Sequence, residues 1–197
     1  MGTADSSLIM LSIPESFESE RLLIRAPHWG DGLAVNEAVK ESIEELRPWM
    51  PWANKVPTVE ESEASIRRSR LEFLERTDLR LLLFRKETGE LIGSSGLHRI
   101  DWQSRKFEIG YWVHSSFARQ GYITEAVDAI TKYAIQELQA NRIEIRCDSR
   151  NVQSARIAER SGFTLEGTLR NDKCDVTGTL RHTMIFAKVR GVEYGRE

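Results

Sequence analysis

The chain has 197 residues, 40% of them hydrophobic and 29% charged, with a formal net charge of -2. This composition is typical of a single globular domain that can bury its own core, and it lacks the basic excess of a nucleic-acid-binding protein. The cysteines, Cys147 and Cys174, are too few for a disulfide framework or a metal cluster. The apolar run at residues 8–11 is too short for a signal peptide or a membrane span. We therefore expect a soluble cytoplasmic protein that binds neither nucleic acid nor membranes.

The first half of the chain predicts a loose leader over residues 1–16, followed by a strand and two helices. The expected elements are a strand at 21–25 and helices at 32–46 and 58–76. Prolines 48 and 51 end the first helix, because an interior proline removes a hydrogen bond and clashes with the preceding turn. Thr58 followed by Glu61 is a capping box, which marks the start of the second helix.

The second half alternates apolar strands with two further helices. The expected strands are 79–85, 91–97, 106–113, 142–148, 163–169 and 181–189, and the expected helices are 123–138 and 151–161. Turns fall at 87–90 and 101–105. This order predicts an α/β (α+β) fold over residues 17–190, with a mixed, mostly antiparallel central sheet of about seven strands and about four helices. Residues 191–197 form a tail.

A polar loop at residues 119–122 joins a predicted strand to the most strongly amphipathic predicted helix. The first N–H groups of a helix have no partners within it, and the helix dipole places partial positive charge there. A glycine at 121 lets the backbone approach a ligand closely. This arrangement is typical of a site for a phosphorylated cofactor.

Four local motifs in this order resemble the GCN5-related N-acetyltransferase (GNAT) superfamily, and within it the RimJ/RimL-like ribosomal-protein branch. The resemblance covers about residues 20–189. The motifs are Leu46–Trp52, Glu108–Val113, Gln120–Ala126, and Asn151 and Ser154 with Glu159–Phe163 and Glu166–Gly167.

The resemblance implies an enzyme that transfers acetyl directly from acetyl-CoA to a primary amine, without a metal. The acceptor that it favours is a protein N-terminal α-amine. A small amine such as an amino acid, a polyamine or an antibiotic remains open, as does a non-catalytic acyl-CoA-binding module. The oligomeric state, a homodimer included, also remains open.

Acetyl transfer to an amine needs a base, an oxyanion donor and a proton for the leaving thiolate. Glu108 is the expected base; alternatively, it is a strand glutamate paired with Arg105 or Lys106. The backbone N–H near Val113 is the oxyanion donor that the resemblance implies. Ser154 is the expected acid, with Tyr122 and Tyr133 as alternatives, although Asn151 and Ser154 at a helix start are equally typical of caps.

The resemblance places the remaining site residues in two groups. Cofactor contacts are expected from Val113, His114, Arg119, Gln120, Gly121, Tyr122, Ile123, Thr124, Asn151 and Ser154. The acceptor pocket is expected to include Trp49, Trp52 and Tyr111. The two tryptophans could equally plug the edge of the core.

The chain departs from the family pattern in two places. The phosphate loop has Ala118 and Ile123 where the family usually has a polar residue and a small one. On the last strand, His182 and Phe186 stand where relatives often have Asp and Tyr. Phenylalanine has no proton to donate, which is why Ser154 is the expected acid.

Overall fold

The computed structural model describes residues 8–195 as one eight-stranded sheet with helices on both faces. The strands are β1 Ser16–Glu18, β2 Leu22–Arg25, β3 Leu79–Arg85, β4 Leu91–Asp101, β5 Lys106–Val113, β6 Arg142–Asp148, β7 Thr164–Cys174 and β8 Leu180–Val189. The helices are α2 Gly32–Leu46, α3 Val59–Glu75, α4 Tyr122–Gln136 and α5 Val152–Arg160, with short 3-10 turns η1 Pro51–Asn54 and η2 Ser115–Phe117. The expected α/β fold is confirmed, with one strand more than predicted. Within residues 8–195, no helix combines the length and the apolar character that crossing a bilayer requires.

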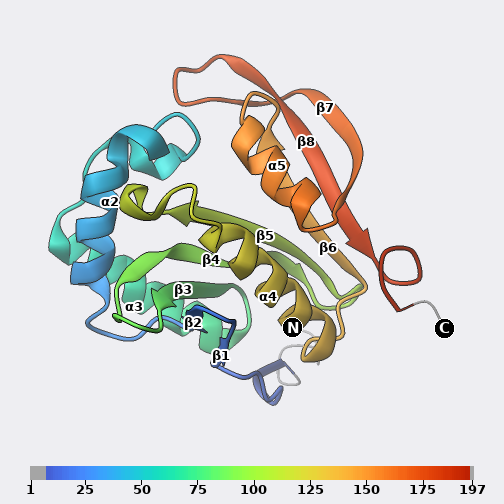
Figure 1. Ribbon diagram of the computed structural model, residues 1–197, viewed down its shortest axis with the longest axis horizontal. Coiled ribbons are helices and arrows are strands. Elements are labelled where there is room, and N and C mark those ends of the chain that lie inside the picture. The colour runs from blue at the N-terminus through green and yellow to red at the C-terminus, as the bar shows by residue number, and fades with distance from the viewer. Residues whose placement is uncertain (1–7, 196–197) are drawn as a thin grey trace, which may run out of the picture.

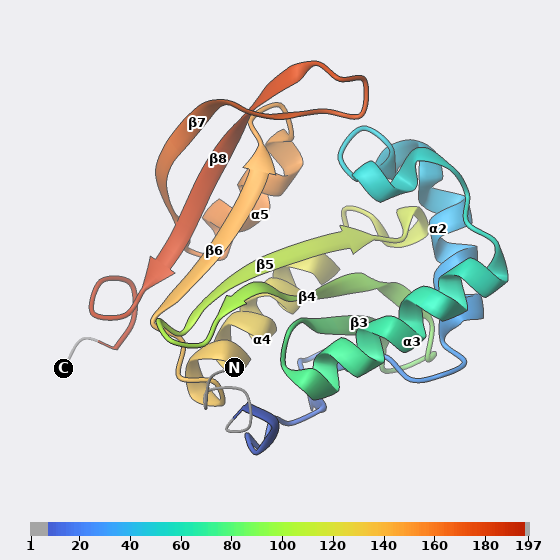
Figure 2. The same ribbon diagram turned by 180° about the vertical axis from the view of Figure 1, so that it is seen from behind.

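The helices divide between the two faces of the sheet, as the two opposite views in Figures 1 and 2 show. Helices α4 and α5 cover one face, where Ile130 and Ala158 are fully buried. On the other face, α2 and α3 enclose a second apolar cluster with Leu82 and Trp112 of the sheet. A sheet covered on both sides explains why β3 is apolar at consecutive positions rather than alternating ones.

The strand order β1-β2-β3-β4-β5-β6-β8-β7 is antiparallel except between β5 and β6. These two parallel strands pair only over Lys106–Glu108 and Arg142–Glu144. Beyond that point they diverge, and the V-shaped separation of β5 from β6 is visible in Figure 1. The open edge of β5 lies next to the start of α4, so the fold brings the polar loop to the mouth of this gap.

The expected leader is the main difference from the predicted elements. Residues 1–7 lie outside the described residues, but residues 8–16 are not loose. Ile13 is buried, and the hydroxyl of Tyr133 donates to the carbonyl oxygen of Pro14 at 2.8 Å. Phe17, in the unpredicted β1, stacks on Tyr133 with ring centroids 4.4 Å apart. These contacts come from α4, more than a hundred residues away, so no local pattern could indicate them.

The capping box is confirmed: the Thr58 side chain accepts from the Glu61 N–H, and the Glu61 carboxylate accepts from the Thr58 N–H. Helix α3 buries Ile66 and Phe73 but leaves Leu71 exposed. The predicted strands 91–97 and 163–169 continue to Asp101 and Cys174, because each pairs with a neighbouring strand along its length.

Candidate active site

The gap between β5 and β6 opens into a cleft of about 810 Å³. Its walls come from the loop after α2, the end of β5, the start of α4 and the start of α5. Seven of the predicted site residues line it: Trp49, Tyr111, Val113, Arg119, Ile123, Asn151 and Ser154. Segments up to about a hundred residues apart in the chain therefore meet around one cavity.

Tyr111 and Ser154 bridge the cleft from β5 to α5. The phenol oxygen lies 2.9 Å from the Ser154 hydroxyl oxygen and donates to the Ser154 carbonyl at 3.1 Å. Burial raises the pKa of the Tyr111 phenol, although the hydrogen bond from Ser154 acts in the opposite direction. Both hydroxyl groups therefore keep their protons at neutral pH and can donate them.

The helix cap at the start of α5 is Asn151, not Ser154. The Asn151 side-chain oxygen accepts from the Ser154 N–H at 3.1 Å. The capping interpretation of the sequence is thus correct for Asn151. It leaves the Ser154 hydroxyl available to Tyr111, the contact that places it in the cleft.

The end of β5 offers a backbone donor to the same cleft. Backbone groups of successive strand residues alternate between the two edges of a strand. The N–H of His114 points toward β4, where it donates to the Ile92 carbonyl at 2.8 Å. The N–H of Val113 therefore points toward the opposite edge, where β6 has already separated.

The start of α4 presents N–H groups without a side-chain cap. Gly121 is the N-cap, with φ +83°, and its carbonyl accepts the first helical hydrogen bond, from Glu125. Glycine adopts this left-handed conformation at little cost, whereas other residues are strained there. Uncapped N–H groups and the helix dipole together suit a phosphate.

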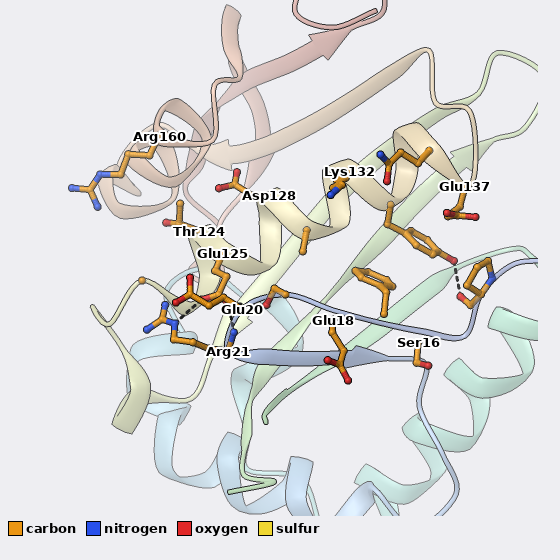
Figure 3. Close-up of a pocket in the computed structure, with 17 residues that line it drawn as sticks. Ser16, Glu18, Glu20, Arg21, Thr124, Glu125, Asp128, Lys132, Glu137 and Arg160 are labelled. Atoms are coloured by element: carbon orange, nitrogen blue, oxygen red, sulfur yellow. Dashed lines mark hydrogen bonds and ion pairs between the residues drawn. The ribbon is translucent and has the colours of Figure 1, made fainter. Parts of the chain in front are cut away.

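Arg21 fastens this loop to the rest of the molecule. Its Nε lies 2.6 Å from the Glu125 carboxylate, its Nη1 donates to the Gln120 carbonyl at 3.1 Å, and its guanidinium lies 4.2 Å from the Tyr122 ring centre. Figure 3 shows Arg21 and Glu125 together in a groove of about 1150 Å³ between β1 and α4. This groove shares no lining residue with the Tyr111–Ser154 cleft.

Arg21→Ala should weaken the affinity for acetyl-CoA, because it releases the loop that would face the cofactor phosphates. We expect KM for acetyl-CoA to rise about 5- to 10-fold with kcat changed less than twofold, a pattern typical of lost ground-state binding. Steady-state kinetics would measure both parameters. Arg67→Ala removes a surface ion pair with Glu63 on α3 and serves as the matched control. An unchanged KM in Arg21→Ala would contradict this role.

Lowering the pH should weaken the contact between Arg21 and Glu125. Burial opposes ionisation of Glu125, but hydrogen bonds from the Ser19 hydroxyl and from the backbone and side chain of Arg21 outweigh it and lower the pKa of this carboxyl. A lowered pKa stabilises the folded state above the ordinary glutamate value of 4.5, and this contribution disappears as the pH falls below it. We expect Glu125→Gln to reduce the loss of thermal stability between pH 5 and pH 3, measured by thermal unfolding.

The other residues predicted to contact the cofactor do not line the cleft. Gly121 and Thr124 line the groove of Figure 3, and Tyr122 is buried beneath Arg21. The imidazole Nε2 of His114 lies 2.8 Å from the Glu41 carboxylate. The Gln120 amide donates to the Ser116 carbonyl. Any contact of these residues with the cofactor would involve their backbone atoms.

Glu108 lies on the α2/α3 side of β5, because alternate residues of a strand share a face and Gly110 and Trp112 line the cavity on that side. Both of its oxygens accept from Arg99 Nη1, at 2.6 and 2.8 Å. It lines a small recess of about 100 Å³ with residues such as Arg146, and not the cleft that holds Ser154. The carboxylate is thus paired, with Arg99 and not with the expected Arg105 or Lys106.

The two departures on the last strand have a structural explanation. Phe186 is fully buried on β8, in register with Ile145 of β6 and Leu165 of β7. Its ring belongs to the main hydrophobic core and lines neither the cleft nor the second cavity. The ring of His182 accepts a hydrogen bond from the Asn171 N–H at 2.9 Å.

A second cavity, of about 530 Å³, lies between the sheet and helices α2 and α3. Trp52 lines it, packed edge-to-face on Trp112 with ring centroids 6.1 Å apart. The cavity and the cleft share three lining residues, Met50, Tyr111 and Trp112. The two cavities therefore adjoin at the end of β5.

His98, which lines this cavity, pairs with Asp78, and the sequence interpretation missed this pair. His98 Nδ1 lies 2.8 Å from the Asp78 carboxylate. Because a carboxylate can only accept, Nδ1 is the donor, and in the corresponding neutral tautomer Nε2 is the acceptor. A Cβ on Gly110 would lie 3.1 Å from the ring, so the missing side chain makes room for His98. The one signal in the sequence was His98 itself, a polar residue two positions after Gly96 and therefore on the same face of β4.

No group of three or more His, Cys, Asp or Glu side chains within residues 8–195 is arranged to hold a metal ion. Cys147 is buried on β6, and burial raises the pKa of its thiol despite a hydrogen bond from Ser154.

Comparison with known sequences identifies the class of protein. A match to the family described as "Acetyltransferase (GNAT) domain" extends over residues 21–164, so this chain belongs to that family. The ribosomal-protein-serine acetyltransferase of Escherichia coli (strain K12) is 32% identical over 127 residues, which is 63% of this chain and 70% of that protein. YdaF of Bacillus subtilis (strain 168) is 39% identical over 98 residues, 50% of this chain and about half (52%) of that protein.

Solved structures agree in fold. RimL, a ribosomal L7/L12 alpha-N-protein acetyltransferase solved with coenzyme A, superimposes with a TM-score of 0.81 at 24% identity, covering 90% of this chain and 97% of that chain. The microcin C7 self-immunity acetyltransferase MccE, solved with acetyl-CoA and AMP, gives a TM-score of 0.82 at 23% identity, with the same coverage.

Proposed function

We propose that this protein catalyses direct transfer of an acetyl group from acetyl-CoA to a primary amine. The observation that carries this proposal is the Tyr111–Ser154 pair: both residues line the cleft, and Tyr111 also lines the second cavity. One cavity reaches the uncapped start of α4, and the other is lined by His98, which pairs with Asp78. A thioester and an amine entering from opposite sides would meet beside two proton donors.

The residues of the cleft fit acetyl-CoA. The uncapped N–H groups at the start of α4, with Arg119 beside them, would hold the pyrophosphate. Asn151 and the open edge of β5 would hold the pantetheine arm. Ile123 and Ala118 line the cleft without closing it. When bound, acetyl-CoA supplies the activated acetyl thioester.

Side chains of this protein would accept the proton of the amine and supply the proton of the leaving thiol. His98 is placed to accept the proton of the incoming amine, because its Nε2 is a free acceptor on the acceptor side. Glu108, the residue that the sequence predicts, remains the rival base, but Arg99 occupies both of its oxygens. The backbone N–H of Val113 would stabilise the oxyanion. Tyr111 and Ser154 would supply the proton that the leaving thiolate takes up.

The acceptor that we propose is a protein N-terminal α-amine, in line with the description of RimL as an alpha-N-protein acetyltransferase and of the Escherichia coli relative as a ribosomal-protein-serine acetyltransferase. A cavity of about 530 Å³ admits the first residues of a peptide rather than a folded surface. The same volume suits a small amine, which is therefore the second candidate. Trp52 is 48% exposed at the rim, where it would contact whatever extends out of the cavity.

Release of free coenzyme A thiol tests this function. We would incubate the protein with acetyl-CoA and a panel of N-terminal peptides, amino acids and polyamines. Acetyl-CoA-dependent thiol release with an acetylated product would support the proposal. Calorimetric binding of acetyl-CoA without turnover on any amine would favour the non-catalytic module, and no binding of any coenzyme A species would refute both.

A further inference from the structure

A cation without a counter-ion lies at the floor of the second cavity. Arg80 Nε donates to the Ser94 hydroxyl at 3.2 Å, and Nη1 contacts the Ser65 and Ser69 hydroxyls at 3.2 and 3.4 Å. Its Nη2 donates to no atom of residues 8–195 and is not among the fully buried, unpaired nitrogens. The hydrogen-bond partners of the guanidinium are thus all neutral hydroxyls, and its Nη2 edge has no partner among residues 8–195.

No carboxylate in the described part of the chain lies within 4.0 Å of this guanidinium, whereas Arg67 and Arg70 of α3 each have one. Burial lowers the pKa of Arg80, and the more distant attraction of Asp78 and Glu72 does not compensate for it. A desolvated charge of this kind is costly unless it is paired. An anion in the cavity would relieve that cost.

Strand register connects Arg80 with the reaction centre. Arg80 of β3 lies opposite Gly96 of β4, which lies opposite Gly110 of β5. Adjacent strands are about 4.8 Å apart, so the Cα atoms of Arg80 and Gly110 are separated by about 10 Å. Neither glycine can carry a side chain without displacing a neighbour: a Cβ on Gly96 would lie 2.6 Å from the Leu79 carbonyl oxygen.

The two glycines therefore keep a trough open across the sheet. One end is the Arg80 guanidinium, and the other is the junction of the two cavities at Tyr111, next to Gly110. The His98 ring lies along the trough, beside the spaces where both missing Cβ atoms would be. A molecule lying in the trough would have one end at the cation and the other near His98 Nε2 and Tyr111.

We propose that the acceptor is an amine that also carries an anionic group, a carboxylate or a phosphate, which Arg80 binds while the amine lies beside His98. Arginine suits this role because its planar fork donates two parallel hydrogen bonds to either anion. The inference rests on the proposed acetyl transfer and narrows its substrate. The anion could belong to a free amino acid, to an acidic residue near a peptide N-terminus, or to a phosphorylated amine.

Matched acceptors test the proposal on the unaltered protein. The pairs are serine and serinamide, phosphoethanolamine and ethanolamine, and the peptides Ser-Asp-Gly-amide and Ser-Asn-Gly-amide. Within at least one pair, the anionic member should have a kcat/KM about 10- to 100-fold higher, the range typical of a charge-assisted hydrogen bond. The pair that shows the preference identifies the source of the anion. Equal kcat/KM within all three pairs would overturn the proposal.

Arg80→Gln should remove that preference. The kcat/KM for the anionic member should fall about 10- to 100-fold, while that for its neutral partner changes less than threefold. Arg80→Lys keeps the charge but not the fork, and should recover part of the loss. Arg67→Gln is the surface control. Equal losses for both members of a pair in a folded Arg80→Gln protein would also overturn the proposal.

A binding measurement separates this inference from the proposed function. N-acetylserine and N-acetylserinamide are the product forms of the first pair, and their binding needs no turnover. Calorimetry should show tighter binding of N-acetylserine, and Arg80→Gln should abolish the difference. Preferential binding without acetylation of any amine would refute acetyl transfer but retain the anion site. Acetylation with no anion preference in either assay would refute the anion site alone.

Discussion

His98→Gln is expected to lower kcat by about 100-fold or more, the usual contribution of a positioned general base. Glutamine fills a similar volume but cannot take up a proton at neutral pH. The acceptor cavity and the Tyr111–Ser154 pair should stay intact, so the KM for acetyl-CoA should change little. Steady-state kinetics with thermal unfolding as a check of folding would measure the effect.

Comparison with Glu108→Gln decides between the two candidate bases. Glu108 lies opposite His98 on β5, but its oxygens are held by Arg99. We expect Glu108→Gln to reduce kcat less than fivefold. A large loss in Glu108→Gln with normal turnover in His98→Gln would reverse the assignment and restore the base predicted from sequence.

Chemical rescue separates a catalytic from a structural effect of His98. In His98→Ala, added imidazole should recover part of kcat, because a free base can enter the vacated space beside Gly110. Asp78→Asn should give a smaller loss, since Asp78 only orients the ring and selects the tautomer. A merely structural role for His98 would not produce rescue by imidazole.

Tyr111→Phe is expected to lower kcat by roughly 10- to 100-fold without weakening acetyl-CoA binding. The substitution removes only the hydroxyl that contacts the Ser154 hydroxyl at 2.9 Å. The proton for the leaving thiolate would then have to come from a less well-placed donor. Kinetics and calorimetry together would separate the loss of turnover from any change in binding.

Ser154→Ala and the double variant with Tyr111→Phe test whether the two hydroxyls donate one proton together. If the two hydroxyls pass one proton, each single variant should lose a similar factor, and the double variant should be little slower than either. Asn151 keeps the cap of α5 in all three proteins, so the helix should remain intact. Normal turnover in Ser154→Ala would leave Tyr111 as the donor by itself. Multiplicative losses in the double variant would contradict a shared relay.

Local patterns in the sequence predicted most of the elements. The spacing of apolar residues predicted the bounds of α2, and alternation predicted β5 and β6 with the correct ends. The capping box at Thr58 placed the start of α3. Such signals are reliable because hydrogen bonds between near neighbours and one buried face define these elements.

Elements and side chains that depend on distant partners could not be predicted in this way. Strand β1 has no pattern of its own, since its contacts with β2 and Tyr133 define it. Phe186 stands where the resembling family often has tyrosine, and only the structure shows that its ring is fully buried in the core. Glu108 occupied a promising strand position, and only its partner Arg99 shows where its carboxylate points.

The sequence by itself determined the family, the order of the elements and the loop that would face a phosphorylated cofactor. Those features depend on residues close together in the chain. The tertiary structure alone decided which side chains meet: Tyr111 with Ser154, His98 with Asp78, and Arg80 with the open trough over Gly96 and Gly110. These contacts depend on strand register and on the separation of β5 from β6. Register is set by packing across the whole sheet, and no spacing along the chain encodes it.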